Sequence, residues 1–184
     1  MDNGESNYRR FLSGDDEGLT LIIKEYKDGL ILYINSYVAN IYVAEDLMQD
    51  TFFKIAVKKP KFKEESSFKT WLYTIGRNVA LNYLKKKSKQ KEVSIDDCGE
   101  LVSQDNVEEA YIKEERKIVL HRCIGKLKPE YRQILWLVYF EDFSLKQVAA
   151  VMKISLHNAE TLVYRARKAL KTQLETEGFS YENL

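Results

Sequence analysis

Apolar side chains recur along this chain at the spacing of one helix face, and this pattern limits the chain to an all-α fold. Between Leu19 and Ile41 the apolar positions follow steps of three and four: Ile22, Tyr26, Leu30, Ile34 and Tyr37. The same spacing returns between Val43 and Lys58: Leu47, Met48, Phe52, Ile55 and Ala56. This period is typical of helices that bury one face. We predict three or four helices here and no strand.

Proline and serine mark where these helices begin and end. Pro60 should end the second helix, and Ser66 or Ser67 can cap a third that runs from Phe68 to about Lys87. After a lapse in periodicity, further helices are predicted at 107–127 and 129–140, with two short ones beyond. We therefore expect two helical domains, with this division of the chain: a loosely held leader 1–18, a first domain 19–88, an acidic linker 89–106, a second domain 107–176 and a tail 177–184.

Composition excludes several classes of protein. The chain has no run of 18 apolar residues and no signal segment, so we expect a cytoplasmic protein that makes no membrane contact of its own. Cys98 and Cys123 stand far apart and neither belongs to a C-x-x-C pair, so neither zinc nor a disulfide framework is indicated. No metal and no cofactor are predicted.

Charge is segregated along the chain although the net charge is only +1. Residues 54–91 hold 12 Lys or Arg against two Glu, whereas residues 92–115 hold nine acids against one Lys. Residues 144–174 hold six bases against Glu160 alone. Two basic blocks favour two contacts on one long nucleic acid, because bound phosphates release counterions. Solvated helix faces are the alternative interpretation.

A helix-turn-helix is indicated in the last third of the chain. Ser144 and Gln147 form a capping box before a helix 145–152, and Ser155 can cap the next helix after a short turn. Apolar or small residues occupy the positions where the two helices must touch: Val148, Ala149, Met152, Ile154, Ala159 and Leu162. Lys153 stands in the turn, where a glycine is common. A purely structural pair of crossing helices is the alternative.

The second helix of this motif should bury Ala159, Leu162, Val163, Ala166 and Leu170 and turn its polar side outward. Its first turns present the candidates for base readout: His157, Asn158, Glu160 and Thr161. Tyr164 also faces outward, and further along lie candidates for phosphate contact: Arg165, Arg167, Lys168 and Lys171. Glu160 could accept a hydrogen bond from a cytosine amino group or simply face solvent.

The third helix of the first domain carries two stripes. The predicted buried stripe comprises Phe68, Leu72, Ile75, Gly76, Val79 and Tyr83. The stripe beside it comprises Trp71, Thr74, Asn78, Asn82 and Lys85. An exposed tryptophan beside two amides and a lysine suits contact with unstacked bases, because the ring can stack while the amides read base edges. A core tryptophan with a solvated polar flank is the alternative.

At this point three strings resemble one family. The strings are AEDLMQDTFFKIA (44–56), SSFKTWLYTIGRNVALNYLKKK (66–87), and LKPEYRQILWLVYFEDFSLKQVAAVMKIS (127–155) followed by YRARKAL (164–170). In this order, and with an acidic segment between them, they resemble bacterial RNA polymerase sigma factors of the two-domain extracytoplasmic-function type. The resemblance implies a sigma-2-like first domain and a sigma-4-like second domain.

The resemblance also implies partners and sites. Core RNA polymerase would bind residues of the first string and their neighbour: Asp46, Gln49, Asp50 and Phe53. The flipped bases of the minus-ten promoter element would meet the loop 61–67 and the helix after it: Lys61, Lys63, Ser66, Ser67, Trp71, Asn78, Asn82, Lys85 and Lys86. The helix-turn-helix would read the minus-thirty-five element, and the linker would run through the polymerase toward its active site. By family habit an anti-sigma factor is a further partner, and the inducing signal would be a stress or envelope signal.

Two positions depart from the family pattern. Housekeeping sigma factors carry a tryptophan pair where this chain has Thr74 and Ile75. Opening of the promoter duplex should therefore depend on base capture in the loop 61–67 and require a promoter sequence that closely matches the preferred one. Glu160 stands where a basic residue is frequent, which leaves its contact with bases open.

Other functions find less support in the residues. Gly125-Lys126 has no glycine five residues before it, and His121 and His157 have no nucleophile or second ligand nearby in sequence, so no catalytic residue is predicted and the chain is not expected to be an enzyme. A free-standing helix-turn-helix regulator that binds an operator without polymerase is the main alternative. A helical interaction module that never touches DNA is the third.

Overall fold

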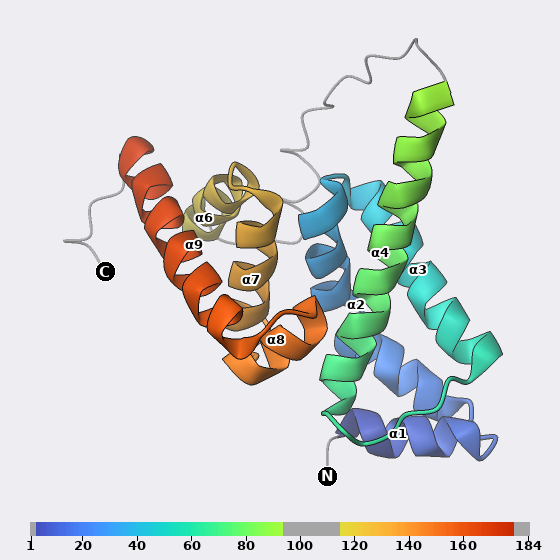
Figure 1. Cartoon of the computed structure of the whole chain (residues 1–184). Helices are drawn as coiled ribbons and strands as arrows, with labels where there is room; N and C mark the ends of the chain where they lie inside the picture. Colours follow the sequence, from blue (N-terminus) through green and yellow to red (C-terminus); the bar gives the residue numbers. More distant parts are fainter. Residues whose placement is uncertain (1–2, 94–114, 179–184) are drawn as a thin grey trace. The chain divides into compact units, whose positions relative to one another are not determined.

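The fold is entirely helical over the residues that the structure, a computed structural model, describes: 3–93 and 115–178. These residues form two units, the first built by α1 to α4 and the second by α6 to α9 (Figure 1). The predictions of an all-α chain and of helical periodicity are confirmed. The predicted acidic linker falls largely on residues 94–114, which lie outside the described residues.

The first unit contains the helices α1 (Asn3–Leu12), α2 (Glu17–Val38), α3 (Ile41–Lys58) and α4 (Phe68–Val93). Local chemistry explains the break between α2 and α3: Ala39 adopts a left-handed φ of 50° after α2, and the Asn40 side chain accepts a hydrogen bond from the Val43 backbone N–H at 3.1 Å. This is an N-cap, which satisfies a donor that the helix itself leaves free. The third predicted helix exists and continues past Lys87 to Val93.

The core of the first unit centres on α2, which contacts each of the other three helices. Hydrophobic residues with no exposed surface come from α2, α3 and α4: Ile22, Leu30, Tyr33, Ile34, Ala44, Ile55, Phe68, Leu72, Tyr73 and Ala80. A Cβ atom on Gly76 would lie 2.8 Å from Leu30 Cδ1, so the glycine permits close approach of α4 to α2. Because α4 contacts both α2 and α3, its buried face is displaced from the predicted stripe: Tyr73 and Ala80 are buried, whereas Ile75, Val79 and Tyr83 are only partly covered.

The expectation of a loosely held leader was wrong. Residues Asn3–Leu12 form α1, whose Tyr8 and Phe11 side chains are buried. Gly18 marks the contact of α1 with α2, because a Cβ atom there would lie 2.3 Å from the Asn7 carbonyl oxygen. The apolar residues of α1 are few, so the helix owes its place to tertiary packing rather than to an extended periodic pattern.

The second unit contains α6 (Glu115–Gly125), α7 (Pro129–Tyr139), α8 (Leu145–Met152) and α9 (Leu156–Thr176). Pro129 occupies the start of α7, as predicted, where a missing N–H costs nothing. Helix α9 contacts α7 and α6. Beyond α9, Glu177 pairs with Lys126, so the first residue of the predicted tail is attached to the end of α6. None of the described helices has both the length and the apolar character needed to cross a bilayer.

Candidate nucleic-acid interface

The helix-turn-helix is built by the local chemistry that the sequence predicted. The backbone N–H of Ser144 donates to Gln147 Oε1 at 2.9 Å, and the Gln147 backbone N–H donates to Ser144 Oγ at 3.4 Å, which together make the capping box before α8. After α8 the chain turns at Lys153, which adopts a left-handed φ of 56°. Ser155 Oγ then accepts from the Asn158 backbone N–H at 3.1 Å and begins α9. The turn has no glycine, and a lysine bears its strained conformation.

Helix α9 presents its predicted outer face to solvent. The side chains on that face are exposed, except that Thr161 is partly covered: His157, Asn158, Glu160, Tyr164, Arg165 and Lys168. The inner face is formed by Ala159, Val163 and Ala166, which are buried, with Leu162 and Leu170 partly covered. Leu156, which the sequence reasoning passed over, is 47% exposed at the first turn of α9, beside the predicted base-reading residues.

Arg167 behaves differently from its neighbours on α9. Its guanidinium lies 5.4 Å from the centroid of the Tyr139 ring, and its Nε donates a hydrogen bond to the Tyr139 hydroxyl. Tyr139 is the last residue of α7, so this contact joins α9 to α7. The sequence predicted a phosphate contact for Arg167, but in the structure this side chain is engaged within the unit.

Trp71 belongs to a cluster of aromatic rings at the start of α4. Its ring centroid lies 5.2 Å from Tyr8, 5.3 Å from Phe68 and 5.5 Å from Phe62. Trp71 is therefore half-buried and packed, not the exposed ring that the stacking hypothesis supposed. Burial raises the pKa of the Tyr8 hydroxyl to about 12.

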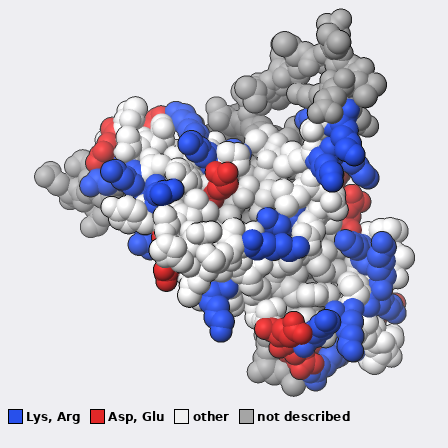
Figure 2. Space-filling model, in the orientation of Figure 1, with Lys and Arg blue, Asp and Glu red and all other residues white. Residues whose placement is uncertain are grey.

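The rest of the polar stripe follows α4 toward its C-terminal end. Thr74 and Asn78 are partly covered, whereas Asn82, Lys85 and Lys86 are exposed. Exposed Lys87 and Lys89 extend the basic charge, and Figure 2 shows basic side chains gathered at this end of α4. The amides and lysines of the stripe are thus accessible, and their availability increases with distance from the aromatic cluster.

The segment 59–67 between α3 and α4 carries the remaining candidates for the minus-ten element. Lys61, Lys63 and Ser66 are exposed. Ser67 instead plays a structural role, because its Oγ accepts from the Thr70 backbone N–H at 3.2 Å and lies 2.8 Å from Thr70 Oγ1. Ser67 rather than Ser66 therefore caps α4. Phe62, which the sequence reasoning missed, packs against Phe68 at 5.8 Å.

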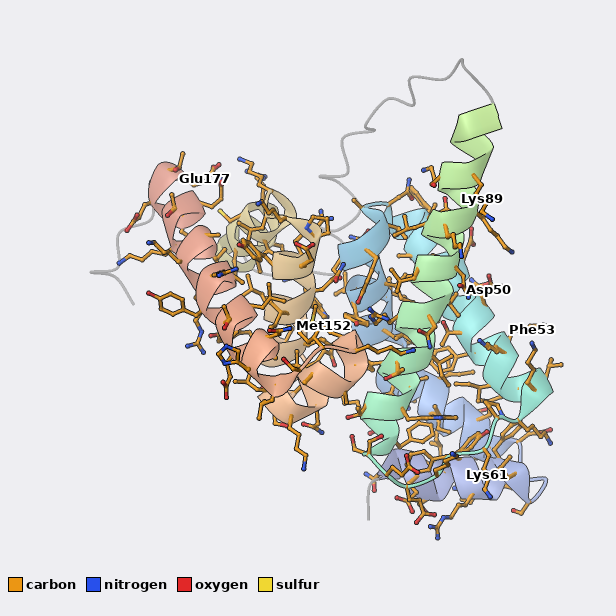
Figure 3. All side chains as sticks on the ribbon, viewed as in Figure 1. Asp50, Phe53, Lys61, Lys89, Met152 and Glu177 are labelled. Atoms are coloured by element: carbon orange, nitrogen blue, oxygen red, sulfur yellow. The ribbon has the colours of Figure 1, made fainter. Side chains whose placement is uncertain are left out.

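The outer face of α3 combines acidic and apolar side chains. Asp46, Gln49 and Asp50 are exposed, and Phe53 is 68% exposed (Figure 3). Tyr42 and Val57 extend this face, at 64% and 63% exposure. Both residues continue the helical spacing through positions 46, 49, 50 and 53, so the spacing could have identified them. Large exposed apolar residues grouped on one face are typical of a protein–protein contact.

A groove between α3 and α4 brings two predicted sites together. Asp50 and Phe53 line it from α3, and Asn82 and Lys86 line it from α4. The sequence assigned the first pair to polymerase and the second pair to DNA without predicting that they share a groove. Among the described residues no group of three or more His, Cys, Asp or Glu side chains could hold a metal ion. Cys123 is buried, and burial is the main cause that raises the pKa of its thiol; Cys98 lies outside the described residues.

Known proteins match both units in the same order. Residues 22–90 match the family Sigma-70 region 2, and residues 117–170 match the family Sigma-70, region 4. The ECF RNA polymerase sigma factor SigM of Bacillus subtilis (strain 168) is 30% identical over 150 residues, covering 82% of this chain and 91% of that protein. The ECF RNA polymerase sigma factor SigW of the same organism is 28% identical over 170 residues, covering 88% and 91%.

Solved structures share the fold. The sigma factor RpoE, in complex with the anti-sigma factor NepR from Bartonella quintana, is similar with a TM-score of 0.66 and 23% identity, covering 85% of this chain and 96% of that chain. CnrH, in complex with the cytosolic domain of CnrY, is similar with a TM-score of 0.67 and 20% identity, covering 95% and 99%. With region 2 on the first unit, region 4 on the second and a relative 30% identical over most of the chain, this protein belongs to the ECF family of RNA polymerase sigma factors, which are non-catalytic transcription initiation factors.

Proposed function

We propose that this chain binds core RNA polymerase, directs it to specific promoters and helps to open them. The observation that carries the proposal is that each unit presents one helix with an accessible polar and basic face, α4 in the first and α9 in the second. A promoter with two separate elements requires two such readers on one polypeptide. The proposed division is that residues 3–93 serve polymerase and the minus-ten element, and that residues 115–178 serve the minus-thirty-five element.

The proposed polymerase contact is the outer face of α3. Asp46, Gln49 and Asp50 supply hydrogen-bonding and charged groups around the exposed Phe53 ring. An apolar anchor with a polar rim is the usual anatomy of a specific protein interface. An Asp50→Ala variant should therefore weaken binding to core polymerase, and Asp28→Ala, which removes another exposed aspartate, on α2, should not.

The proposed minus-ten contact comprises the exposed Lys61, Lys63, Ser66, Asn82, Lys85 and Lys86 with the partly covered Asn78, Trp71 and Ser67. The lysines would meet phosphates, and the amides would meet base edges. The packed Trp71 would offer only part of its surface, so base capture would depend chiefly on the segment 59–67 and the amides.

The proposed minus-thirty-five contact is the outer face of α9. His157, Asn158, Glu160 and Thr161 lie in its first turns, where recognition helices meet base edges, and Tyr164, Arg165 and Lys168 follow toward the phosphates. Because Arg167 contacts Tyr139, we propose that Arg167 holds α9 against α7. Its positive charge would still contribute to the electrostatic attraction of DNA.

Run-off transcription tests the proposed function. Core polymerase with this chain should initiate at a defined set of sites in a genomic promoter library, and core polymerase alone should not. Asn82→Ala should reduce initiation mainly when the minus-ten element is intact, and Asn158→Ala mainly when the minus-thirty-five element is intact, so each variant is the control for the other. Lys168→Ala should weaken promoter binding, whereas Lys128→Ala, at an exposed lysine on the start of α7, should not. Specific duplex binding by the chain alone, with no promoter fired in the library, would instead favour a free-standing regulator.

An anti-sigma factor and a stress or envelope signal complete the proposal. RpoE was solved in complex with the anti-sigma factor NepR. The exposed apolar residues of α3, which include Tyr42, Phe53 and Val57, are the part of this chain that such an inhibitor would cover. Pull-down from the native organism with the wild-type chain and with Phe53→Ser should recover an inhibitor only with the wild type.

A further inference from the structure

Helix α1 is attached to the segment 59–67 by contacts between residues about 50 positions apart in the sequence. The Tyr8 hydroxyl donates a hydrogen bond to the Pro60 carbonyl oxygen at 2.6 Å. Arg9 Nη2 lies 2.6 Å from Glu64 Oε1. Lys59 Nζ lies 4.7 Å from the centroid of the Phe11 ring. The segment runs alongside α1 in Figure 1, so these contacts hold it at its beginning and in its middle.

Ring packing attaches the same segment to α4 through the same residue of α1. Tyr8 lies 5.2 Å from Trp71 and 5.6 Å from Phe68, measured between ring centroids. Phe62, inside the segment, lies 5.5 Å and 5.8 Å from these two rings. Tyr8 and Phe62 therefore share both of their α4 partners. Displacing α1 would remove a neighbour of the rings against which Phe62 packs.

Glu64, in the middle of the segment, has a strained backbone conformation. Its φ of 60° lies in the left-handed region, which residues other than glycine rarely adopt. Arg9 binds the Glu64 carboxylate while also binding Glu5 on α1 at 2.6 Å, so the guanidinium is itself held in place. The strained residue is thus tied to a helix of the unit.

We propose that α1 is a positioning element for promoter-strand capture: Tyr8 and Arg9, acting through Pro60 and Glu64, hold the segment 59–67 in its binding shape before DNA arrives. The inference rests on the proposed role of this segment at the minus-ten element. A segment that is already ordered loses less conformational entropy on binding, so the same contacts with DNA yield a higher affinity. Neither Tyr8 nor Arg9 needs to touch DNA for this effect.

The test compares three full-length variants. Tyr8→Phe removes only the hydroxyl that binds Pro60, and Arg9→Ala removes the pair with Glu64. Arg10→Ala is the matched control, because Arg10 is exposed to a similar extent on the same helix but pairs with Asp15, away from the segment. Each variant is assembled with core polymerase, and its binding to a fluorescent single strand carrying the minus-ten sequence of a promoter that the wild type transcribes is titrated. The combined Tyr8→Phe and Arg9→Ala variant should bind about threefold to tenfold more weakly, and Arg10→Ala should stay within about twofold of the wild type.

A second measurement reports the segment itself. In the free chain carrying Trp136→Phe, Trp71 is the remaining tryptophan, and acrylamide should quench it more strongly in the combined variant than in Arg10→Ala. The inference requires both changes: stronger quenching with unaltered strand binding, or weaker strand binding with unaltered quenching, would overturn it. A wild-type holoenzyme that initiates from the promoter yet captures no strand would instead overturn the proposed role of the segment, which separates the two failures.

Discussion

Replacement of Tyr8 by alanine should destabilise the first unit far more than its place near the chain terminus suggests. The Tyr8 side chain is 1% exposed and its ring packs against Phe11, Phe68 and Trp71. Removing a buried aromatic ring in this way costs about 3–5 kcal/mol. The lost hydrogen bond to Pro60 adds about 1 kcal/mol, because the half-buried carbonyl can be partly rehydrated. The expected loss is therefore about 4–6 kcal/mol, a large part of the stability of a typical domain.

Urea unfolding followed by tryptophan fluorescence measures this loss unit by unit, because Trp71 lies in the first unit and Trp136 in the second. In a chain that carries Trp136→Phe the signal reports the first unit alone. Tyr8→Phe should lower the free energy of unfolding by about 1 kcal/mol, because it removes the hydroxyl and keeps the ring. This variant therefore separates the contribution of the hydrogen bond from that of ring packing. Leu12→Ala, which removes a 44% exposed apolar side chain from the same helix, should change stability by less than about 0.5 kcal/mol. If Tyr8→Ala lost no more than Leu12→Ala, the packing of α1 around Tyr8 would be refuted.

Three further outcomes are expected in the second unit. Lys153→Gly should stabilise it by about 0.5–1 kcal/mol in urea unfolding followed by Trp136 fluorescence, because glycine adopts the left-handed φ of this turn without steric cost; a loss of stability would contradict the strain assigned to Lys153. Burial lowers the pKa of His121 to about 4 from its ordinary 6.5, so the unfolded state binds a proton more readily than the folded state. The second unit should therefore keep its full stability above about pH 6.5 and become less stable as the pH falls toward 4. His121→Gln should flatten that slope, and an unchanged pH profile would show that other groups cause it. If Glu160 reads a cytosine, Glu160→Ala should abolish the discrimination of about 1–3 kcal/mol against one altered base pair in the minus-thirty-five element, whereas loss of discrimination at no position would place Glu160 in solvent.

Helices and caps were predictable because their signals are local. The capping box of Ser144 and Gln147, the cap at Ser155 and Pro129 at the start of α7 each depend on residues a few positions apart, and each is present in the structure. The long apolar period of α2 predicted that helix for the same reason. Family membership was also within reach of the sequence, since the motif strings follow one another in a specific order.

Only tertiary structure decided the surroundings of the site residues. Helix α1 has 10 residues, and a helix of less than about 12 residues is marginal in isolation, so its existence depends on the contacts of Tyr8 and Phe11 with distant parts of the unit. Trp71 is partly covered by Tyr8 and Phe62 and not exposed as predicted, and Arg167 contacts Tyr139, 28 positions away. Periodicity determines which face of a helix is apolar, but it carries no information about which distant side chain covers a position at the edge of that face. The sequence therefore determined most of the helices, the caps at Ser144 and Ser155 and the family, and tertiary packing decided that α1 forms and that it contacts the segment 59–67.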